Sequence, residues 1–444
     1  MIKKKVCVIG LGYVGLPMAI AIANIKKRNK YLYATYGYDN DLKKIENIQN
    51  SIRTGKLSID SLDLTLNKKF LYSSKNNKIN LFTDIKSISS MDILILSVGF
   101  DFINNKNSFK NLTLLTENIS SNIKKGALLL IETTLPPGTF EKVLKPKIIK
   151  SLKKRKMKIS DIFLAYSYER VMPGKNYYDS IINNYRCYSG FNRFSKKRVK
   201  KFLKTLINHE KFPLKELNSI TECETAKILE NSYRSINIAL IDEWVRYADL
   251  IKIDLMNVIN AIKIRPSHSN IMSPGLGVGG YCLPKDGLFA EKSAKFLFKK
   301  KINFPFIKLA SKINNEMPLT AIKLIENKIN KFKNKKILIM GTSYKEDVDD
   351  ERNSPSKLLI KKLLLKEAKI TTFDPMIKKE KLPKFSSFNL ILFCVKHEKF
   401  NKIPLNKYSK APIYFDLNNV LSAKKIKFMK NNSYKLYTLG KYYE

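Results

Sequence analysis

A glycine-rich loop that carries a single cysteine is the segment whose residue types most clearly allow chemistry. Residues 275–286 read GLGVGGYCLPKD, so Cys282 directly follows the loop, with Lys285 and Asp286 shortly behind it. Glycines let the backbone approach a ligand closely. A cysteine reacts as a thiolate, which nearby positive charge stabilises. The loop predicts a nucleophilic thiol, with a redox thiol or a structural cysteine as the alternatives.

A second glycine pattern opens the chain. The spacing GxGxxG occupies residues 10–15, between a strand expected at 4–9 and a helix expected at about 14–24. This context lets the pyrophosphate of a dinucleotide approach the N-terminus of the helix, and the alternative is a phosphate loop for another nucleotide. A nicotinamide site combined with a poised thiol suggests oxidation through a covalent thioester.

Asp39 is the expected acceptor for the ribose of the dinucleotide. It ends the strand expected at 33–38, and an acidic residue there favours NAD over NADP, whose additional phosphate it would repel. Asp39 follows Gly15 at a slightly longer spacing than the roughly 20 residues that are usual. We attribute the extra length to the lysine-rich segment 26–30.

Polar residues also follow two later strands. Residues 132–139, ETTLPPGT, bring hydroxyl groups into a turn after the strand expected at 127–132, which alone describes an ordinary strand-to-helix junction. Glu169 follows the strand expected at 162–167 and should lie at the carboxyl edge of the sheet, where ligands bind. Taken alone, Glu169 and Arg170 are more typical of a surface pair.

A long helix is expected from about residue 220 towards Pro266. Thr221 and Glu224 match a capping box at its start. Its apolar stripe follows helical spacing and indicates a spine that joins domains or pairs subunits. The stripe consists of Leu229, Tyr233, Ile236, Leu240 and Trp244.

Nearly opposite that stripe, Lys227, Asn231 and Arg234 form a polar row at i, i+4 and i+7. Such a row is most often a solvated face. A lysine and an amide that project into a cleft could instead stabilise a developing oxyanion.

The composition bounds the class of protein. A formal charge of +45 could indicate nucleic acid, an anionic surface or an acidic substrate, but the lysines are spread along the whole chain rather than clustered. We therefore expect no nucleic-acid role and no membrane role. Five scattered cysteines and three isolated histidines predict no disulfide scaffold and no metal site. No apolar leader precedes the first strand, so we expect a cytoplasmic protein.

Alternating strands and helices predict an α/β fold with doubly wound parallel sheets. Further strands are expected at 336–340, 370–373, 390–395 and 413–415, with a helix leading to them after Pro318. Three domains follow: an NAD-binding Rossmann-like domain at 1–215, a central long-helix domain at 216–315 and a second Rossmann-like domain at 316–444.

Six motifs in order resemble the UDP-glucose/GDP-mannose dehydrogenase family across essentially the whole chain. They are GLGYVGLP at 10–17, TTLPPGT at 133–139, YERVMPG at 168–174, ETAKILENSYRSINIA at 224–239, GLGVGGYCLPKD at 275–286 and SYKEDVDDERNSP at 343–355. The resemblance implies two successive NAD-dependent oxidations at C6 of a nucleotide-linked hexose, giving a uronic acid. It also implies a homodimer paired through the central helix and a last domain that binds the nucleotide, with a UDP-sugar as the expected substrate.

The resemblance also implies roles for individual residues. Cys282 would trap the aldehyde as a thiohemiacetal and then carry the thioester. Lys227 and Asn231 would stabilise oxyanion character, Asp286 and Thr134 would position or activate water, and Glu169 would act as general base. The implied cofactor residues are Gly10, Gly12, Tyr13, Val14, Gly15, Asp39 and Thr134. The implied substrate residues are Glu169, Arg170, Lys227, Asn231, Arg265, Gly279, Lys345 and Arg352.

Several loops depart from the family pattern. Tyr168 stands where a proline is common, Tyr281 where a histidine is frequent, and either Arg265 or His268 matches the arginine that many members reach across a dimer interface. The Glu-Arg-Val-x-Pro-Gly form is closer to members that act on UDP-N-acetylhexosamines. Two alternatives stay open: a two-electron dehydrogenase of the β-hydroxyacid type, and a non-catalytic binder of nucleotide sugars or nucleic acid.

Overall fold

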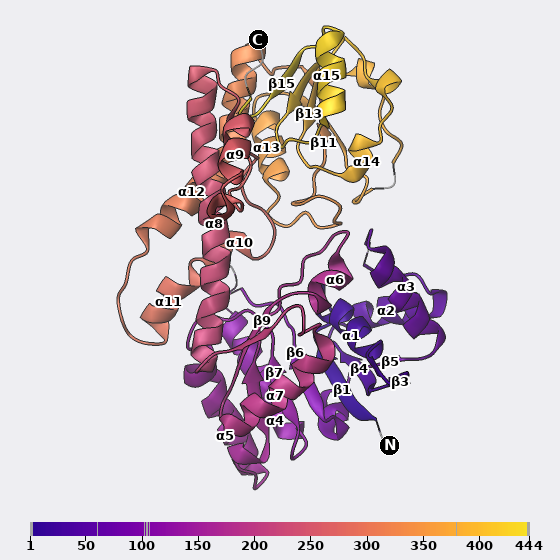
Figure 1. The fold of residues 1–444 in the computed structure, drawn as a ribbon, viewed down its shortest axis with the longest axis vertical. Helices are drawn as coiled ribbons and strands as arrows, with labels where there is room; N and C mark the ends of the chain where they lie inside the picture. Colours follow the sequence, from indigo (N-terminus) through magenta and orange to yellow (C-terminus); the bar gives the residue numbers. More distant parts are fainter. Residues whose placement is uncertain are drawn as a thin grey trace. The chain divides into compact units, whose positions relative to one another are not determined.

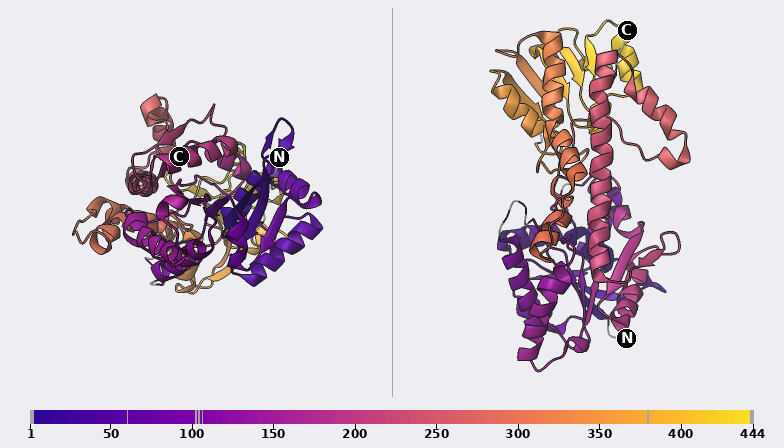
Figure 2. Two further views of the ribbon diagram at one scale, coloured as in Figure 1. Left: turned by 90° about the horizontal axis from the view of Figure 1, so that it is seen from below. Right: turned by 90° about the vertical axis from the view of Figure 1, so that its left-hand side faces the viewer.

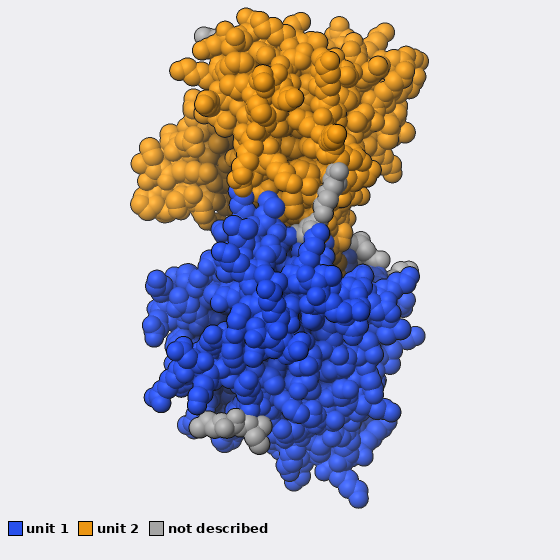
Figure 3. Space-filling model, turned by 90° about the vertical axis from the view of Figure 1, so that its right-hand side faces the viewer, with its two compact units in different colours: residues 1–229, 288–303 blue, residues 230–287, 304–444 orange. Residues whose placement is uncertain are grey.

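The computed structural model describes residues 3–59, 61–101, 103, 105, 107–378 and 380–441. Met1 and Ile2, which precede the first strand, lie outside the described residues. The chain divides into two compact units, the first formed by residues 1–229 and 288–303 and the second by residues 230–287 and 304–444 (Figure 3). Each unit contains its own sheet. The three-domain division predicted from the sequence stays a prediction.

The first unit is built on an eight-stranded sheet with the order β10-β9-β8-β7-β6-β1-β4-β5 (Figure 1). The expected first strand and the strand before Asp39 are confirmed with their predicted bounds. The strands are β1 (Lys4–Ile9), β4 (Tyr33–Tyr38), β5 (Ile79–Phe82), β6 (Ile93–Leu96), β7 (Leu128–Ile131), β8 (Phe163–Tyr166), β9 (Arg186–Gly190) and β10 (Leu214–Glu216). A small antiparallel hairpin, β2 (Lys26–Lys27) and β3 (Lys30–Tyr31), accounts for the long spacing before Asp39.

One edge of this sheet departs from the parallel pattern. The strands from β5 to β8 pair in parallel, but β9 pairs with β8 in antiparallel direction before β10 pairs with β9 in parallel. An antiparallel strand near the edge of an otherwise parallel sheet is common in α/β proteins. The α/β class is confirmed.

Helices cover both faces of the sheet because side chains alternate along each buried strand. Val6 and Val8 of β1 belong to one apolar core, whereas Cys7 and Ile9 belong to the other. The helices of this unit are α1 (Gly15–Ala23), α2 (Leu42–Thr54), α3 (Leu64–Lys75), α4 (Ser108–Asn122), α5 (Lys145–Lys154), α6 (Tyr177–Ile182), α7 (Arg193–Leu206) and α11 (Phe289–Phe296). Short 3-10 and π turns occur at Ile85–Ser90, Phe140–Leu144 and Ile159–Asp161.

The second unit contains a five-stranded parallel sheet with the order β12-β11-β13-β14-β15. Its strands are β11 (Lys336–Met340), β12 (Lys369–Phe373), β13 (Leu390–Phe393), β14 (Ile413–Asp416) and β15 (Leu436–Thr438). Its helices are α9 (Leu255–Lys263), α10 (Leu283–Asp286), α12 (Pro305–Ile329), α13 (Pro355–Leu364), α14 (Glu398–Asn401) and α15 (Ala423–Asn431). The expected strands are confirmed in place, so this part is a second Rossmann-like sheet.

Helix α8 (Ile220–Ile251) runs unbroken over 32 residues (Figure 2). The expected capping box at Thr221 and Glu224 is wrong. Instead the Ser219 hydroxyl accepts a hydrogen bond from Glu222 N at 3.1 Å, and the Glu222 carboxylate accepts one from Asn218 N at 3.0 Å. Glu224 is buried and binds a different loop, as described below.

The apolar stripe of α8 is largely exposed. Leu229, Tyr233, Leu240 and Trp244 expose between 49% and 66% of their surface. By contrast Lys227, on the polar row, exposes only 7%. The expectation that the polar row is a solvated face therefore fails at Lys227.

The long helical period predicted as far as Pro266 is interrupted. Helix α8 ends at Ile251, Lys252 adopts a φ of 60°, and Asp254 caps the new helix α9 through the N–H groups of Met256 and Asn257. A left-handed residue followed by a side-chain cap ends one helix and starts the next.

The sequence suggested that a helix begins after Pro318. Instead, Pro318 lies inside α12. Proline has no N–H group, so the carbonyl of Asn314 one turn earlier loses its helical partner. Gly277 of the glycine-rich loop lies against this carbonyl with a φ of 91°, and a Cβ at residue 277 would stand 2.1 Å from the oxygen. Only glycine fits there, which ties the loop to α12. No helix among the described residues has the length and apolar character needed to cross a membrane.

Candidate active site

The GxGxxG segment forms a turn between β1 and α1 that only glycine can make. Gly10 adopts a φ of 92°, and a Cβ at Gly15 would stand 1.7 Å from the Gly10 carbonyl oxygen. No atom of the described residues lies within 4 Å of the Cβ position at Gly12. A hollow of about 570 Å³ opens at this edge of the sheet and is lined by Gly10, Gly12, Asp39 and Ser97 among others. A backbone cradle with open space at its middle glycine fits the close approach of a pyrophosphate.

Asp39 lies at the same edge, directly after β4. The residue is only 5% exposed. Its carboxylate accepts a hydrogen bond from Leu11 N at 2.9 Å and forms an ion pair with the Lys44 amino group at 2.9 Å. The turn and the acid are therefore held together by a backbone hydrogen bond. Tyr13 is fixed through its carbonyl oxygen, which accepts a hydrogen bond from the Tyr177 hydroxyl, and Val14 is the residue before α1.

The structure distinguishes the two threonines after β7. The Thr133 hydroxyl accepts from Val98 N at 3.0 Å and donates to Leu96 O at 3.2 Å, so it holds the ends of neighbouring strands together. The Thr134 side chain is half-buried, and its hydroxyl forms no hydrogen bond with another described residue. The Thr133 hydroxyl is therefore engaged within the sheet, whereas the Thr134 hydroxyl is not engaged by another described residue.

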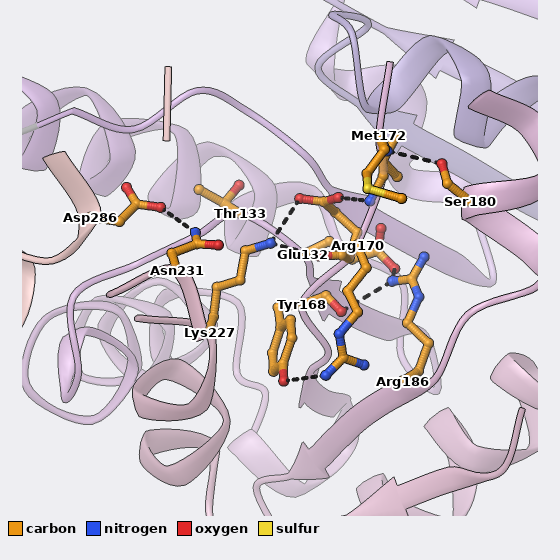
Figure 4. A network of polar contacts seen from close by, with 12 residues as sticks. Glu132, Thr133, Tyr168, Arg170, Met172, Ser180, Arg186, Lys227, Asn231 and Asp286 are labelled. Atoms are coloured by element: carbon orange, nitrogen blue, oxygen red, sulfur yellow. Dashed lines mark hydrogen bonds and ion pairs between the residues drawn. The ribbon is translucent and has the colours of Figure 1, made fainter. Parts of the chain in front are cut away.

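Lys227 and Glu169 are brought together in the first unit. The Lys227 amino group donates to the Glu169 carbonyl oxygen at 2.7 Å and lies 3.6 Å from its carboxylate. It also lies 5.5 Å from the centre of the Tyr168 ring, and Figure 4 shows Arg170 at the hydroxyl of that tyrosine. The two candidate groups that the sequence placed 58 residues apart form one buried contact.

A buried ion pair beneath this contact was missed by the sequence. Arg186 and Glu132 are both fully buried, and Arg186 Nη1 lies 3.0 Å from Glu132 Oε1 (Figure 4). Burial raises the pKa of Glu132 to about 7; the charge of Arg186 opposes this shift and the negative charge of Glu169 adds to it. The charges of this pair therefore contribute to the electrostatic potential at Glu169. No spacing rule joins an arginine in β9 to a glutamate after β7, so the sequence gave no signal for it.

Glu224 is a second residue whose position the sequence did not reveal. Its carboxylate accepts hydrogen bonds from Gly138 N at 2.6 Å and Phe140 N at 2.9 Å. Burial raises the pKa of Glu224 to about 8, although those two N–H groups lower it. Glu224 thus attaches the first turns of α8, which carry Lys227, to the loop that follows β7.

In the second unit, Cys282 immediately precedes α10 and is exposed, whereas Cys7, Cys223 and Cys394 are buried. Asp286, one turn later, is fully buried. One of its oxygens lies 2.7 Å from the Lys285 amino group. The other lies 2.7 Å from the Asn231 amide nitrogen (Figure 4). Two of the predicted site residues, Asn231 and Asp286, are therefore in contact one turn from the thiol, and Lys285 joins them.

The backbone before Cys282 is bound on both sides to the loop after β11. Gly280 N donates to Arg352 O at 2.9 Å, and Gly280 O accepts from the Asn353 amide at 3.0 Å. A Cβ at Gly280 would lie 2.7 Å from the Tyr344 ring. Burial raises the pKa of Tyr344 to about 12, with smaller contributions from Asp350 and Cys282.

The remaining residues that were predicted to bind the substrate lie in different local surroundings. Gly279 packs on the Asn353 carbonyl, where a Cβ would stand 2.8 Å away. Arg352 is half exposed and is held by both carboxylate oxygens of Asp350, and Lys345 lies 3.9 Å from Glu346. Arg265 and His268 both lie on the exposed segment after α9, so the structure does not distinguish them.

Among the described residues, no three His, Cys, Asp or Glu side chains gather in a way that could hold a metal ion.

Three domain models of one family match the chain in order. They are the NAD binding domain, the central domain and the UDP binding domain of the UDP-glucose/GDP-mannose dehydrogenase family, at residues 4–207, 221–316 and 338–423. The UDP-N-acetyl-D-mannosamine dehydrogenase of Methanococcus maripaludis strain C7 is 33% identical and covers 94% of this chain and 93% of its own. The enzyme of the same name from Methanocaldococcus jannaschii is 30% identical and covers 99% of this chain and 97% of its own.

The fold is also that of solved dehydrogenases. The UDP-D-ManNAc dehydrogenase from Pyrococcus horikoshii superimposes with a TM-score of 0.82 at 24% identity, covering 98% of this chain and 99% of its own. A UDP-glucose dehydrogenase from Pyrobaculum islandicum gives a TM-score of 0.79 at 18% identity, covering 96% of both chains. The glycine turn and the buried Asp39 agree with the three domain matches, which follow the order of the sequence. The chain belongs to the UDP-glucose/GDP-mannose dehydrogenase family and is an NAD-dependent nucleotide-sugar dehydrogenase.

Proposed function

We propose that the protein oxidises the C6 hydroxyl of a UDP-linked N-acetylhexosamine to the carboxylate, in two steps that remove four electrons, with Cys282 as the nucleophile. The observation that carries this proposal is an exposed thiol one turn from a buried carboxylate, Asp286, which Lys285 and Asn231 hold. UDP-N-acetyl-D-mannosamine is the first substrate to test, because relatives at 30% to 33% identity bear that name.

The covalent route accounts for every atom. Oxidation of the alcohol releases a hydride from C6 and a proton from the hydroxyl, leaving an aldehyde. The Cys282 thiol gives up its proton and its sulfur adds to the aldehyde carbon, and the aldehyde oxygen takes up a proton to give a thiohemiacetal. Oxidation of the thiohemiacetal releases a second hydride and a second proton and leaves a thioester. Water then breaks the C–S bond, so the uronic acid leaves and the thiol is restored. NAD, held at Gly10–Gly15 and Asp39, supplies a hydride acceptor for each oxidation.

Lys227 and Asn231 are proposed to stabilise the negative charge that develops on the C6 oxygen. They stand four residues apart on α8, so they project from the same side of the helix. Lys227 has little exposure and a hydrogen bond to a carbonyl, which keeps its amino group oriented before the charge appears. Fixed donors in a poorly solvated place are worth most to a transition state.

Hydrolysis of the thioester needs a group that accepts a proton from water. Glu169 is proposed for this role, since its side chain is only 11% exposed and its carboxylate lies 3.6 Å from the Lys227 amino group. Asp286 and Thr134 are proposed to position water or activate it. Lys345 and Arg352 are proposed to bind the phosphates of the nucleotide, with Arg170 and Arg265 as further contacts to the substrate.

The exposed stripe of α8 supports a homodimer. Tyr233, Leu240, Trp244 and Tyr247 follow helical spacing and each exposes about half of its surface. Exposed aromatic rows are characteristic of interfaces. The five scattered cysteines, which form no disulfide among the described residues, and the use of NAD support the cytoplasm as the place of action.

A Trp244→Glu variant is expected to dissociate the proposed dimer, because a carboxylate would be desolvated in the middle of the apolar stripe. Analytical ultracentrifugation should show a dimer for the parent and a monomer for the variant at the same micromolar concentration. Lys252→Glu is the matched control, because it changes more charge at the end of α8 but leaves the stripe intact. A parent that sediments as a monomer would contradict the proposal.

A Gly12→Ala variant is expected to fold normally but to bind NAD at least about tenfold more weakly. No atom of the described residues lies within 4 Å of the new Cβ, so the methyl group would occupy space that a bound dinucleotide needs. Fluorescence titration with NADH measures the affinity, and the melting temperature checks the fold. Unchanged affinity would move the dinucleotide away from this turn.

The stoichiometry of NADH tests the proposed reaction directly. With a limiting amount of UDP-N-acetyl-D-mannosamine, two NADH should form for each sugar, together with a uronate that mass spectrometry detects. One NADH per substrate would favour the two-electron alternative. A panel of UDP- and GDP-hexoses then identifies the preferred sugar, and binding without turnover by any of them would favour a non-catalytic binder.

A further inference from the structure

The hairpin of β2 and β3, inserted between α1 and β4, helps to form a hollow of about 1100 Å³ in the first unit. The hollow lies where β1, β4 and β6 begin, since Lys4, Tyr33 and Ile93 are part of its lining. The NAD-binding turn follows the opposite ends of the same parallel strands (Figure 1). The hollow is therefore separate from the proposed cofactor site.

Seven cationic side chains line this hollow. Lys27, Arg28 and Lys30 come from the hairpin, Arg198 and Lys201 from α7, Lys4 from β1, and Lys3 directly precedes β1. None of the described residues that line the hollow is acidic. In the described part of the chain, none of the seven forms an ion pair.

This arrangement differs from the diffuse charge of the protein. Lys124 and Lys125 precede the next strand at the same edge of the sheet, and they pair with Asp92 at 2.6 Å and Asp161 at 3.0 Å. The two acids of this edge therefore form their ion pairs with lysines that do not line the hollow. A concentration of cations with few acids nearby destabilises the folded chain by repulsion, which a bound anion relieves.

Two details concern individual cations of the hollow. Burial lowers the pKa of Lys4, the charges of Arg198 and Lys201 lower it further, and the charge of Asp92 opposes them. The Nε atom of Arg198 is buried and has no hydrogen-bond partner among the described residues. An unsatisfied buried donor costs free energy that a bound acceptor would recover.

The other part of the lining is aromatic and apolar. Tyr31, Leu32, Tyr33, Ile93 and Phe202 line the hollow, and the Tyr33 hydroxyl is hydrogen-bonded to Thr205 at 2.8 Å. Such walls suit an aromatic or apolar body, whereas a flat anionic surface could not enter a hollow. We propose that this hollow binds a small organic phosphate, with its phosphates on the hairpin and α7 cations and its body against the tyrosines.

The test uses ATP as the probe in the presence of saturating NAD and UDP, which fill the dinucleotide site and the proposed nucleotide-sugar site. Isothermal titration calorimetry of the full chain should detect one further ATP site. The Arg198→Ala/Lys201→Ala variant is expected to weaken ATP binding at that site at least tenfold. The Lys153→Ala/Lys154→Ala variant loses the same charge at exposed positions of α5, outside the hollow, and should bind like the parent.

Equal effects of the two variants, or no additional ATP site, would overturn the proposal. Inorganic tripolyphosphate that binds as tightly as ATP would overturn the role of the aromatic wall. Binding to anionic vesicles that is lost in the first variant, without any ATP site, would point to a membrane surface instead. Melting temperatures confirm that both variants fold. Turnover without ATP should stay within about twofold of the parent, which separates this test from that of the proposed function.

Discussion

A Cys282→Ser variant is expected to lose uronate formation by about a thousandfold or more while the first oxidation persists. Serine is nearly isosteric, but its hydroxyl is not ionised at neutral pH and cannot form a thioester. The aldehyde should then be reduced back or released instead of advancing. Removing a covalent nucleophile typically costs several powers of ten in rate. Mass spectrometry of the sugar product, with NADH counted in the same reaction, measures both steps.

The matched control for this variant is Cys187→Ser, which changes a half-buried thiol in the first unit. It should retain two NADH per substrate. Incubation of the parent with substrate and NAD, followed by acid quenching, should also leave an acyl adduct on the peptide that contains Cys282. Uronate formation at the rate of the parent by Cys282→Ser would refute the covalent route.

Among substitutions in the first unit, Arg186→Met is expected to lower the stability of the protein the most. Both partners of the Arg186–Glu132 pair are completely buried, so the variant leaves an uncompensated carboxylate. Breaking such a pair costs about 3–5 kcal/mol. For a unit of this size, a loss of that order lowers the melting temperature by roughly 2–4 °C per kcal/mol. Differential scanning calorimetry measures the shift.

The dependence on pH gives this prediction a sign. In the folded state the pKa of Glu132 is about 7, above its ordinary value of 4.5. Protonation therefore favours the fold: the contribution of Glu132 is complete below pH 4.5 and is lost as the pH rises through 7. The charge of Arg186 lowers the pKa of Glu132. Removal of Arg186 therefore raises this pKa further and extends the loss of stability to higher pH. The difference between parent and variant should thus be larger at pH 9 than at pH 6.

A double variant, Glu132→Gln/Arg186→Met, separates buried charge from packing. It removes both charges, so most of the lost stability should return and the additional dependence on pH should vanish. If the double variant is as unstable as Arg186→Met, the loss comes from packing and the electrostatic account is wrong.

Local patterns were sufficient to predict much of the fold. The strands at Lys4–Ile9, Tyr33–Tyr38 and Lys336–Met340 have the bounds that their apolar runs indicated. Such runs are decided by burial on both faces, which the sequence shows directly. The antiparallel β9 was not foreseen, because strand direction at a sheet edge depends on a connection whose path no periodicity records.

The candidate site was predictable where it follows motifs and not where it depends on distant contacts. Asn231 and Asp286 were named from the sequence, and the structure places them 2.7 Å apart. The burial of Lys227 could not be read from α8, because its spacing fits a solvated face equally well. Arg186 and Glu224 bind partners more than 50 residues away, and no local rule connects them.

The first unit is assembled from two stretches of chain, and this limits how the protein can be divided. Phe289, from the returning stretch, is fully buried against Phe100 with ring centres 6.0 Å apart, and Phe298 covers Gly138. A polypeptide that stops at residue 215 lacks both aromatic rings and exposes the apolar surface that they cover. We therefore expect that the apolar core of the dinucleotide-binding unit is completed only after residues 289–298 have been synthesised.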